Sequence, residues 1–117
     1  MSVKYQGSCH CGAVAYEAVV DTVASMTCNC SMCGRSGTIL SFIPAADFSL
    51  LRGEDHLADY QFHKKHIHHV FCTTCGIKPF AYGNGEDGSL TYAINLRCLE
   101  GLDLDTLTPQ PVDGRSL

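Results

Sequence analysis

The sequence predicts a mainly-β fold in a single small domain that spans residues 1–117. Short runs in which apolar and polar residues alternate recur along the chain, as in half-buried strands, and glycine or proline separates them. No long run has the 3.6-residue apolar period of an amphipathic helix. A chain of 117 residues suits one domain with a modest core, and domains of this size often gain stability from a staple.

The first half of the chain contains four strand-like runs, at residues 12–20, 37–43, 48–52 and 56–62. In the first of them, Val14, Tyr16 and Ala18 share one face. The second run stops at Pro44, which can begin one helical turn in the segment PAADF. A turn at residues 53–55, GED, joins the last two runs.

Three further strand-like runs occupy the second half of the chain, at residues 65–71, 77–83 and 89–96. The segment GNGEDGS between the last two is a clear turn. In the run KHIHHVF, His66 and His68 share one face, whereas His69 lies on the more apolar face with Ile67 and Phe71. The final segment, TLTPQPVDGRSL, has no periodicity and is predicted to be an extended loop.

Charge and hydropathy exclude two classes of partner. The formal net charge is -4, from 8 Lys plus Arg and 12 Asp plus Glu, and no basic run provides a surface for nucleic acid. No apolar stretch is long enough to span a bilayer, and the first residues, MSVKYQGS, lack the apolar segment of a signal peptide. We therefore expect a cytoplasmic protein whose thiols stay reduced. Nothing in the sequence indicates its oligomeric state.

Seven of the eight cysteines gather in three tight groups, and only Cys98 stands alone. The groups are CHC at residues 9–11, CNCSMC at 28–33 and CTTC at 72–75. Disulfide frameworks usually spread their cysteines to close long loops, whereas two neighbours in C-x-C can both reach one ion. Each group is followed by a glycine (Gly12, Gly34, Gly76), and the residue after a metal knuckle often needs a positive φ. The pattern favours metal binding over disulfides or buried thiols.

Two ions would account for the seven grouped cysteines. Thiolate-only sites in the cytosol suit zinc or iron–sulfur clusters, and a structural zinc typically takes two pairs of cysteines. The two pairs are Cys9, Cys11, Cys72 and Cys75. The remaining triplet is Cys28, Cys30 and Cys33. Three protein ligands are the number found at a catalytic zinc, which keeps one position for water or substrate.

Other interpretations of the triplet remain open. A distant fourth ligand could close the site, and the candidates are Cys98, His10, His63, His66, His68 and His69. Two points argue against a fourth ligand. A lone cysteine is more often a small buried hydrophobe, and the pattern of the histidines favours half-exposed residues of a strand. The spacing in CSMC also fits a redox pair, but no βαβ pattern surrounds it. The triplet could also be empty in purified protein, because three ligands hold zinc less tightly than four.

The motifs GSCHCGAV, CNCSMCGRSG and FCTTCGIKPF resemble those of the glutathione-dependent formaldehyde-activating enzyme family, which includes the centromere protein V type domains. The segments LRGEDHLADY and NLRCLEG match as well, so the resemblance covers nearly the whole chain. It implies several short antiparallel sheets, in a β-tent-like arrangement, built around a structural zinc. It also implies the ligand sets reached from the grouping: Cys9, Cys11, Cys72 and Cys75 for a structural zinc, and Cys28, Cys30 and Cys33 for a catalytic one.

The resemblance further implies the addition of glutathione to formaldehyde, which gives S-hydroxymethylglutathione and is classed with the carbon–sulfur lyases. Zinc at an open position can deprotonate a thiol or polarise an aldehyde, so the chemistry suits the triplet. One departure concerns the residue after the triplet, because the family often carries a basic residue there and this chain has Gly34 followed by Arg35. The cations available for the carboxylates of glutathione are Arg35, Lys64, Lys65 and Lys78.

We therefore expect a zinc-dependent carbon–sulfur lyase or synthase that acts on a small thiol, such as glutathione, and a small aldehyde. The alternative is a non-catalytic zinc module that binds a small thiol or a protein. The two hypotheses differ in whether the triplet turns over a substrate or only holds the chain together.

Overall fold

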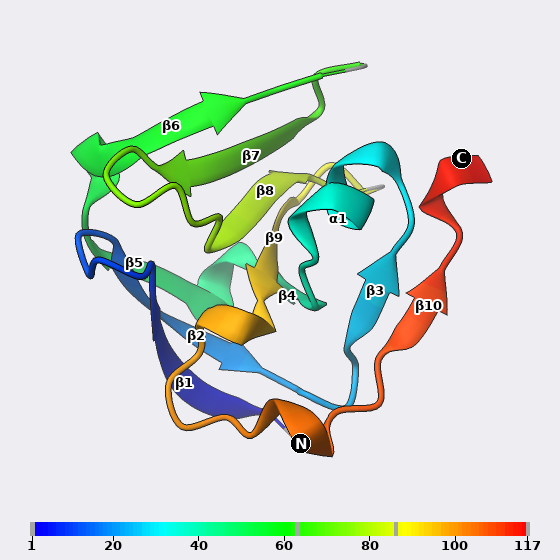
Figure 1. Cartoon of the computed structure of the whole chain (residues 1–117), viewed down its shortest axis with the longest axis horizontal. Coiled ribbons are helices and arrows are strands. Elements are labelled where there is room, and N and C mark those ends of the chain that lie inside the picture. Colours follow the sequence, from blue (N-terminus) through cyan, green and yellow to red (C-terminus); the bar gives the residue numbers. More distant parts are fainter. Residues whose placement is uncertain (1, 63, 86, 117) are drawn as a thin grey trace.

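The computed structural model describes residues 2–62, 64–85 and 87–116, and its strands form two sheets (Figure 1). The smaller sheet has the order β1-β2-β5, with β1 at Val3–Ser8, β2 at Ala15–Val20 and β5 at Phe48–Arg52. The larger sheet has the order β10-β3-β4-β9-β8-β7-β6. Its strands are β3 (Met26–Cys28), β4 (Leu40–Pro44), β6 (Leu57–Tyr60), β7 (Ile67–Cys72), β8 (Phe80–Asn84), β9 (Leu90–Asn95) and β10 (Gln110–Val112). The prediction of a mainly-β, mostly antiparallel fold is confirmed.

The helical segments are short. They are α1 (Ser31–Ser36) and the 3₁₀ turns η1 (Ala45–Asp47), η2 (Glu54–His56), η3 (Leu96–Cys98), η4 (Leu104–Thr106) and η5 (Gly114–Ser116). The turn η1 matches the helical turn expected in the segment PAADF, but Pro44, which was expected at its first position, is its N-cap and the last residue of β4. Within the described ranges, no helix has the length and apolar character needed to cross a membrane.

The core lies between the two sheets and is centred on β2. Val14, Tyr16 and Ala18 are fully buried, as their alternation predicted. The ring of Tyr16 stacks on Phe48 and meets Phe80 edge-on, with both pairs of ring centroids 5.4 Å apart. Aromatic pairs in these geometries add stability beyond the area they bury. The cluster joins β5 of the smaller sheet to β8 of the larger one and thereby fixes the segments that carry the cysteines.

The turn predicted at residues 53–55 is present and depends on glycine. Gly53 has a φ of 94°, in the left-handed region that favours glycine. A Cβ atom at this position would overlap the carbonyl oxygen of Ala13 and lie 2.7 Å from the Cα atom of Val14. The turn therefore packs directly on the segment between the first cysteine pair and β2.

Three strands and the α-helix were not predicted from the sequence, namely β1, β3, β10 and α1, and neither were the 3₁₀ turns η3, η4 and η5. In the strand β1, Val3 and Tyr5 alternate with polar residues, but Gly7 is the one buried residue, so the run has too little apolar character to stand out as a strand. The helix α1 has six residues, fewer than two turns, and leaves no periodic signal. The expectation that the C-terminal segment is an extended loop was wrong for Gln110–Val112, which pairs in parallel with β3, and for Gly114–Ser116, which forms the turn η5. Three residues that include a proline carry too little pattern to be recognised as a strand.

Candidate metal centres

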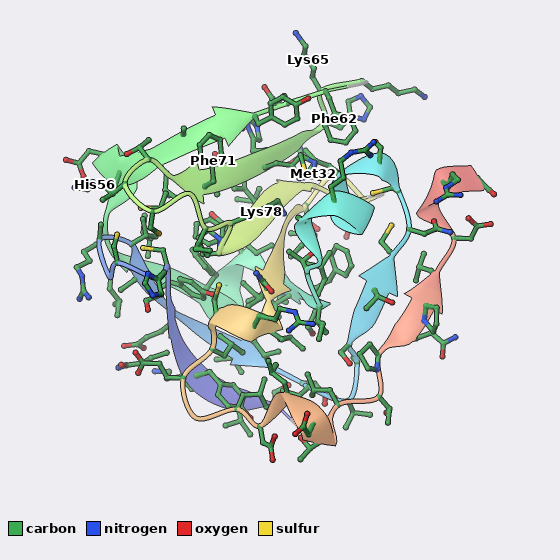
Figure 2. The ribbon with its side chains drawn as sticks, in the orientation of Figure 1. Met32, His56, Phe62, Lys65, Phe71 and Lys78 are labelled. Atoms are coloured by element: carbon green, nitrogen blue, oxygen red, sulfur yellow. The ribbon has the colours of Figure 1, made fainter. Side chains whose placement is uncertain are left out.

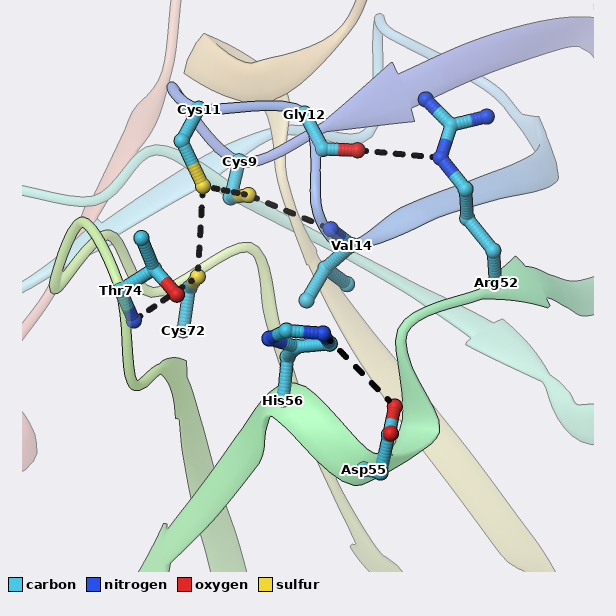
Figure 3. A network of polar contacts seen from close by, with 9 residues as sticks. All are labelled: Cys9, Cys11, Gly12, Val14, Arg52, Asp55, His56, Cys72 and Thr74. Carbon is cyan, nitrogen blue, oxygen red and sulfur yellow. Dashed lines mark hydrogen bonds and ion pairs between the residues drawn. The ribbon is translucent and has the colours of Figure 1, made fainter.

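The four cysteines of the two outer groups converge at one point. Cys9 and Cys11 lie in the turn between β1 and β2, Cys72 ends β7, and Cys75 lies in the turn between β7 and β8. The four sulfurs all lie within 4.8 Å of one another. Figure 3 shows three of these side chains, with Cys11 between Cys9 and Cys72. The site joins segments that are 61 residues apart in the chain.

The spacing of these sulfurs fits a tetrahedral zinc ion. The Cys11 sulfur lies 3.6 Å from that of Cys9 and 3.7 Å from that of Cys72. Tetrahedral coordination with Zn–S bonds of about 2.3 Å places sulfurs about 3.8 Å apart. The backbone N–H groups of Val14 and Thr74 donate to the sulfurs of Cys9 and Cys72, each at 3.4 Å, and such donors stabilise thiolates. The donor set and its surroundings therefore suit a closed structural site.

The glycines after both pairs have the predicted conformation. Gly12 has a φ of 83° and Gly76 a φ of 80°. The N–H of Gly12 donates to the carbonyl of Cys9 at 3.3 Å, and that of Gly76 to the carbonyl of Cys72 at 2.8 Å. These bonds close the tight turns that bring the two sulfurs of each pair to the same side, and positive φ at glycine permits them without steric cost.

The triplet forms a second cluster at the start of α1. Cys28 ends β3, Cys30 is the N-cap of α1, and Cys33 lies in its first turn. Their three sulfurs lie within 4.8 Å of one another, and all three residues are half-buried. The N–H of Cys33 donates to the sulfur of Cys30 at 3.3 Å, which is a thiolate version of an N-terminal cap. All eight cysteines are described, and none forms a disulfide.

The prediction of a positive φ after the second cysteine group was wrong, because Gly34 does not have one. This residue continues α1, and its N–H donates to the carbonyl of Cys30 at 2.8 Å. The positive φ occurs instead at Gly37, whose φ of 69° ends the helix. The physical reason is that Cys30 and Cys33 are one helical turn apart, so the helix itself brings their sulfurs together and no tight turn is needed.

The thiol pKa values diverge within each cluster. In the first site, a hydrogen bond from the backbone N–H of Ile77 to the sulfur of Cys75 lowers the pKa of Cys75 to about 6. In the second site, burial raises the pKa of Cys33 to about 12. Burial also acts to raise the pKa of Cys30, but hydrogen bonds to its sulfur, above all from the N–H of Cys33, outweigh burial and lower that pKa. Neighbouring thiolates repel one another, so the sulfurs of a cluster do not all ionise without a cation. A divalent ion at the centre of each cluster would remove this conflict.

A cavity of about 480 Å³ lies beside the first cysteine cluster, whose Cys9 is among the residues that line it. Lys78, Arg97 and His10 line it, and no aspartate or glutamate is among the described residues that do so. Thr38 also lines the cavity, is 3 % exposed, and its hydroxyl makes no hydrogen bond with the described part of the chain. The chain as a whole carries a net charge of -4, but Lys78 and Arg97 give this part of its surface an excess of positive charge, which favours an anion over a cation.

Lys78 connects this cavity to the triplet. Figure 2 shows Lys78 just before β8, beside α1. Burial lowers the pKa of Lys78, while the neighbouring thiols of Cys33 and Cys30 act to raise it. The ammonium group is therefore close enough to the triplet for their charges to interact. The carbonyl of Lys78 accepts a hydrogen bond from Asn95 Nδ2 at 3.0 Å, which fixes the backbone at this position.

The proposed fourth ligands do not join the triplet. The cluster contains no histidine and no further cysteine, aspartate or glutamate from the described ranges, and His63 lies outside them. His68 pairs with Asp59 at 2.6 Å. His69 is buried against the ring of Phe62, with ring centroids 5.2 Å apart. His10 and His66 are exposed, and Cys98 lines the cavity, where its sulfur accepts from Asn95 Nδ2 at 3.6 Å.

Of the four cations predicted for a carboxylate-bearing ligand, only Lys78 lines the cavity. Arg35 is exposed on α1 and donates to the carbonyl of Ser31, while Lys64 and Lys65 lie in the exposed segment between β6 and β7. Sequence reasoning missed Arg97, whose Nε donates to the carbonyl of Gly37 at 3.1 Å. Its position beside Cys98 in the segment NLRCLEG was the available signal, because that segment was already among the motifs of the resemblance.

A family model described as glutathione-dependent formaldehyde-activating enzyme matches residues 4–111. The chain belongs to this family. A crystal structure of a Rhodobacter sphaeroides protein, a structural genomics target, is similar to it with a TM-score of 0.80 and 33% sequence identity. That similarity covers 91% of this chain and 97% of the other. All eight cysteines lie within the family match, whereas residues 112–117 lie beyond it.

Proposed function

We propose that the protein is a zinc-dependent carbon–sulfur lyase or synthase that adds a small thiol to a small aldehyde, with glutathione and formaldehyde as the pair that the family name indicates. The observation that carries the proposal is the position of Lys78, which lines the cavity and also lies close enough to Cys30 and Cys33 for their charges to interact. Three converging sulfurs with no fourth side-chain ligand among the described residues leave a position for a substrate atom. The cavity that Lys78 and Arg97 line offers positive charge to the rest of that substrate.

Cys28, Cys30 and Cys33 would hold the ion, and Cys9, Cys11, Cys72 and Cys75 would hold a second, structural ion. When bound, a zinc ion at the triplet supplies Lewis acidity and lowers the pKa of a neighbouring thiol. In the overall reaction a carbon–sulfur bond forms between the thiol sulfur and the carbonyl carbon. The hydrogen of the thiol ends on the former carbonyl oxygen, so no oxidant or reductant is consumed. Such a thiol is available in the cytosol, where we place the reaction.

Lys78 and Arg97 have the position to hold the carboxylates of the thiol substrate. Both line the cavity, and the ammonium group of Lys78 is also close enough to the triplet to interact with its thiols. A bound carboxylate in this cavity would offset the desolvation of Lys78. A volume of about 480 Å³ is within the range of small-molecule sites, which extends from roughly 300 to 1,000 Å³. Orientation of the thiol by its carboxylates is the contribution expected of such residues.

The test compares Cys30→Ser with the unchanged protein. We expect the variant to keep its circular dichroism spectrum, lose one zinc ion per chain and lose acceleration of adduct formation between glutathione and isotope-labelled formaldehyde, measured by exchange NMR above the spontaneous rate. Unchanged protein that binds two zinc ions and glutathione but accelerates nothing would contradict the proposal and favour the non-catalytic zinc module.

The role of Lys78 is tested separately with Lys78→Met. Loss of a hydrogen bond to a charged group costs about 1.5–3 kcal/mol, so the KM for glutathione should rise about tenfold or more. Arg35→Met is the matched control, because Arg35 is exposed on α1 and does not line the cavity. Zinc content should be the same in both variants. Equal KM values for the two would show that Lys78 does not contact the thiol.

A further inference from the structure

The C-terminal segment 110–116 runs alongside the triplet. Its strand β10 pairs in parallel with β3, with Val112 opposite Cys28, and the turn η5 follows directly (Figure 1). In the larger sheet, β10 is one of the two edge strands, and it lies next to β3. We call residues 110–116 the strap. The family match ends at residue 111, within the strap.

Asn29 ties the strap to the cysteine loop with three hydrogen bonds. This residue lies between Cys28 and Cys30. Its backbone N–H donates to the carbonyl of Val112 at 3.2 Å. Its side-chain Nδ2 donates to Asp113 Oδ1, and its Oδ1 accepts from the N–H of Arg115, both at 2.9 Å. Both ends of the amide are therefore used, and the rotamer of Asn29 is set by the strap.

Gly114 brings the strap into contact with the triplet itself. A Cβ atom at Gly114 would overlap the sulfur of Cys28 and lie 3.3 Å from the Cβ of Cys30. The backbone at Gly114 does not lie in the left-handed region, so glycine is not needed there for its φ. The contact alone accounts for glycine at this position. No other residue could pack its backbone against Cys28 without moving the sulfur or the strap.

We propose that the strap is a positioning element for the second metal site, with Gly114 seating Cys28 and with Asp113 and Asn29 holding the loop 28–30. Partners outside the first coordination shell typically set the orientation of metal ligands, and their loss costs about 10- to 100-fold in metal affinity. A three-cysteine site gains more from such support than a four-cysteine site, because each remaining ligand must be held in place. The strap also covers Cys28 on one side, which directs a substrate to approach from another.

The test uses cobalt(II), whose sulfur charge-transfer and ligand-field bands report both affinity and geometry at a thiolate site. Protein with zinc at the four-cysteine site is titrated with cobalt(II) against a competing chelator. Gly114→Ala should weaken cobalt binding at the triplet by about 10- to 100-fold and shift the bands. Asp113→Ala should act in the same direction with a smaller effect. The four-cysteine site should keep its zinc in both variants.

Asp103→Ala is the matched control. Asp103 is also exposed and its Oδ1 accepts from the N–H of Asp105 at the turn η4, but it makes no contact with the triplet among the bonds of the described residues. Cobalt affinity within twofold of the unchanged protein for Gly114→Ala would overturn the proposal, and so would equal effects of Asp113→Ala and Asp103→Ala. If Gly114→Ala does not fold, the cobalt affinities of Asn29→Ala and Asp113→Ala test the proposal instead, and affinities equal to that of the unchanged protein would overturn it. The readout is metal binding, so the result stands whether or not the proposed reaction is found.

Discussion

Acid should destabilise the protein through His69, which is buried without a hydrogen bond to its Nδ1 among the described residues. The side chain is 8 % exposed. Burial lowers its pKa from 6.5 to about 4, and the positive charge of Lys78 adds to the shift, while Asp59 opposes it. The folded protein therefore keeps a neutral imidazole at a pH where the unfolded chain has already taken up a proton.

The size of the effect follows from the gap between the two pKa values. Between pH 6.5 and pH 4 the unfolded state binds more protons, so the free energy of unfolding falls as the pH falls. Each pH unit inside this window costs about 1.4 kcal/mol, so the loss is about 2 kcal/mol at pH 5 and about 3 kcal/mol at pH 4, where the folded state also begins to take up the proton. Above pH 6.5 His69 contributes no pH dependence, because it is neutral in both states.

The assay is urea unfolding of the zinc-loaded protein at several pH values between 7 and 4.5, with bound zinc measured at each. His69→Phe should lose about 2 kcal/mol less than the unchanged protein between pH 7 and pH 5. His66→Phe is the control, because His66 is exposed on the same segment and should leave the dependence unaltered. The reasoning is refuted if His69→Phe and the unchanged protein lose stability equally while both retain their zinc.

Three further substitutions test other parts of the structure. Tyr16→Phe removes the hydrogen bond from the Tyr16 hydroxyl to the carbonyl of Pro79 at 3.2 Å and should cost about 1–3 kcal/mol in urea unfolding; no loss would mean that the bond contributes nothing. Gly53→Ala should cost more than about 2 kcal/mol by the same assay, because it adds strain at a φ of 94° to an overlap with Ala13. Cys72→Ser should abolish folding by circular dichroism, since a structural zinc contributes about 10–16 kcal/mol and whole proteins are stable by about 5–15 kcal/mol. A folded Cys72→Ser variant would contradict a structural role for that site.

The cysteine clusters could be predicted from the sequence because their chemistry is local. Two thiols in C-x-C or C-x-x-C can reach one ion, and the glycines at 12 and 76 indicate the tight turns that this requires. Counting ligands then divides seven sulfurs into four and three. The same argument gave the wrong result at Gly34. Cys30 and Cys33 lie one helical turn apart, so the helix brings their sulfurs together and no glycine with a positive φ is needed after them.

The surroundings of the triplet could not be predicted, because they come from segments far apart in the chain. Arg97 reaches the cavity through the turn after β9, and Gly114 reaches Cys28 through a parallel pairing of only three residues. Arg97 lies in the motif NLRCLEG, but that motif does not say which cavity the side chain enters, and Gly114 has no motif of its own. Their positions follow from how the larger sheet is ordered, and strand order is a tertiary property that alternation of apolar residues does not encode.

Anomalous diffraction at the zinc absorption edge, from crystals of freshly purified and reduced protein, tests the central claim most directly. The account predicts two peaks per chain. One should lie at about 2.3 Å from each sulfur of Cys9, Cys11, Cys72 and Cys75, and the other at that distance from the sulfurs of Cys28, Cys30 and Cys33, with its fourth ligand not a side chain of the protein. A single peak at the first cluster, or a second peak closed by a fourth protein side chain, would contradict it.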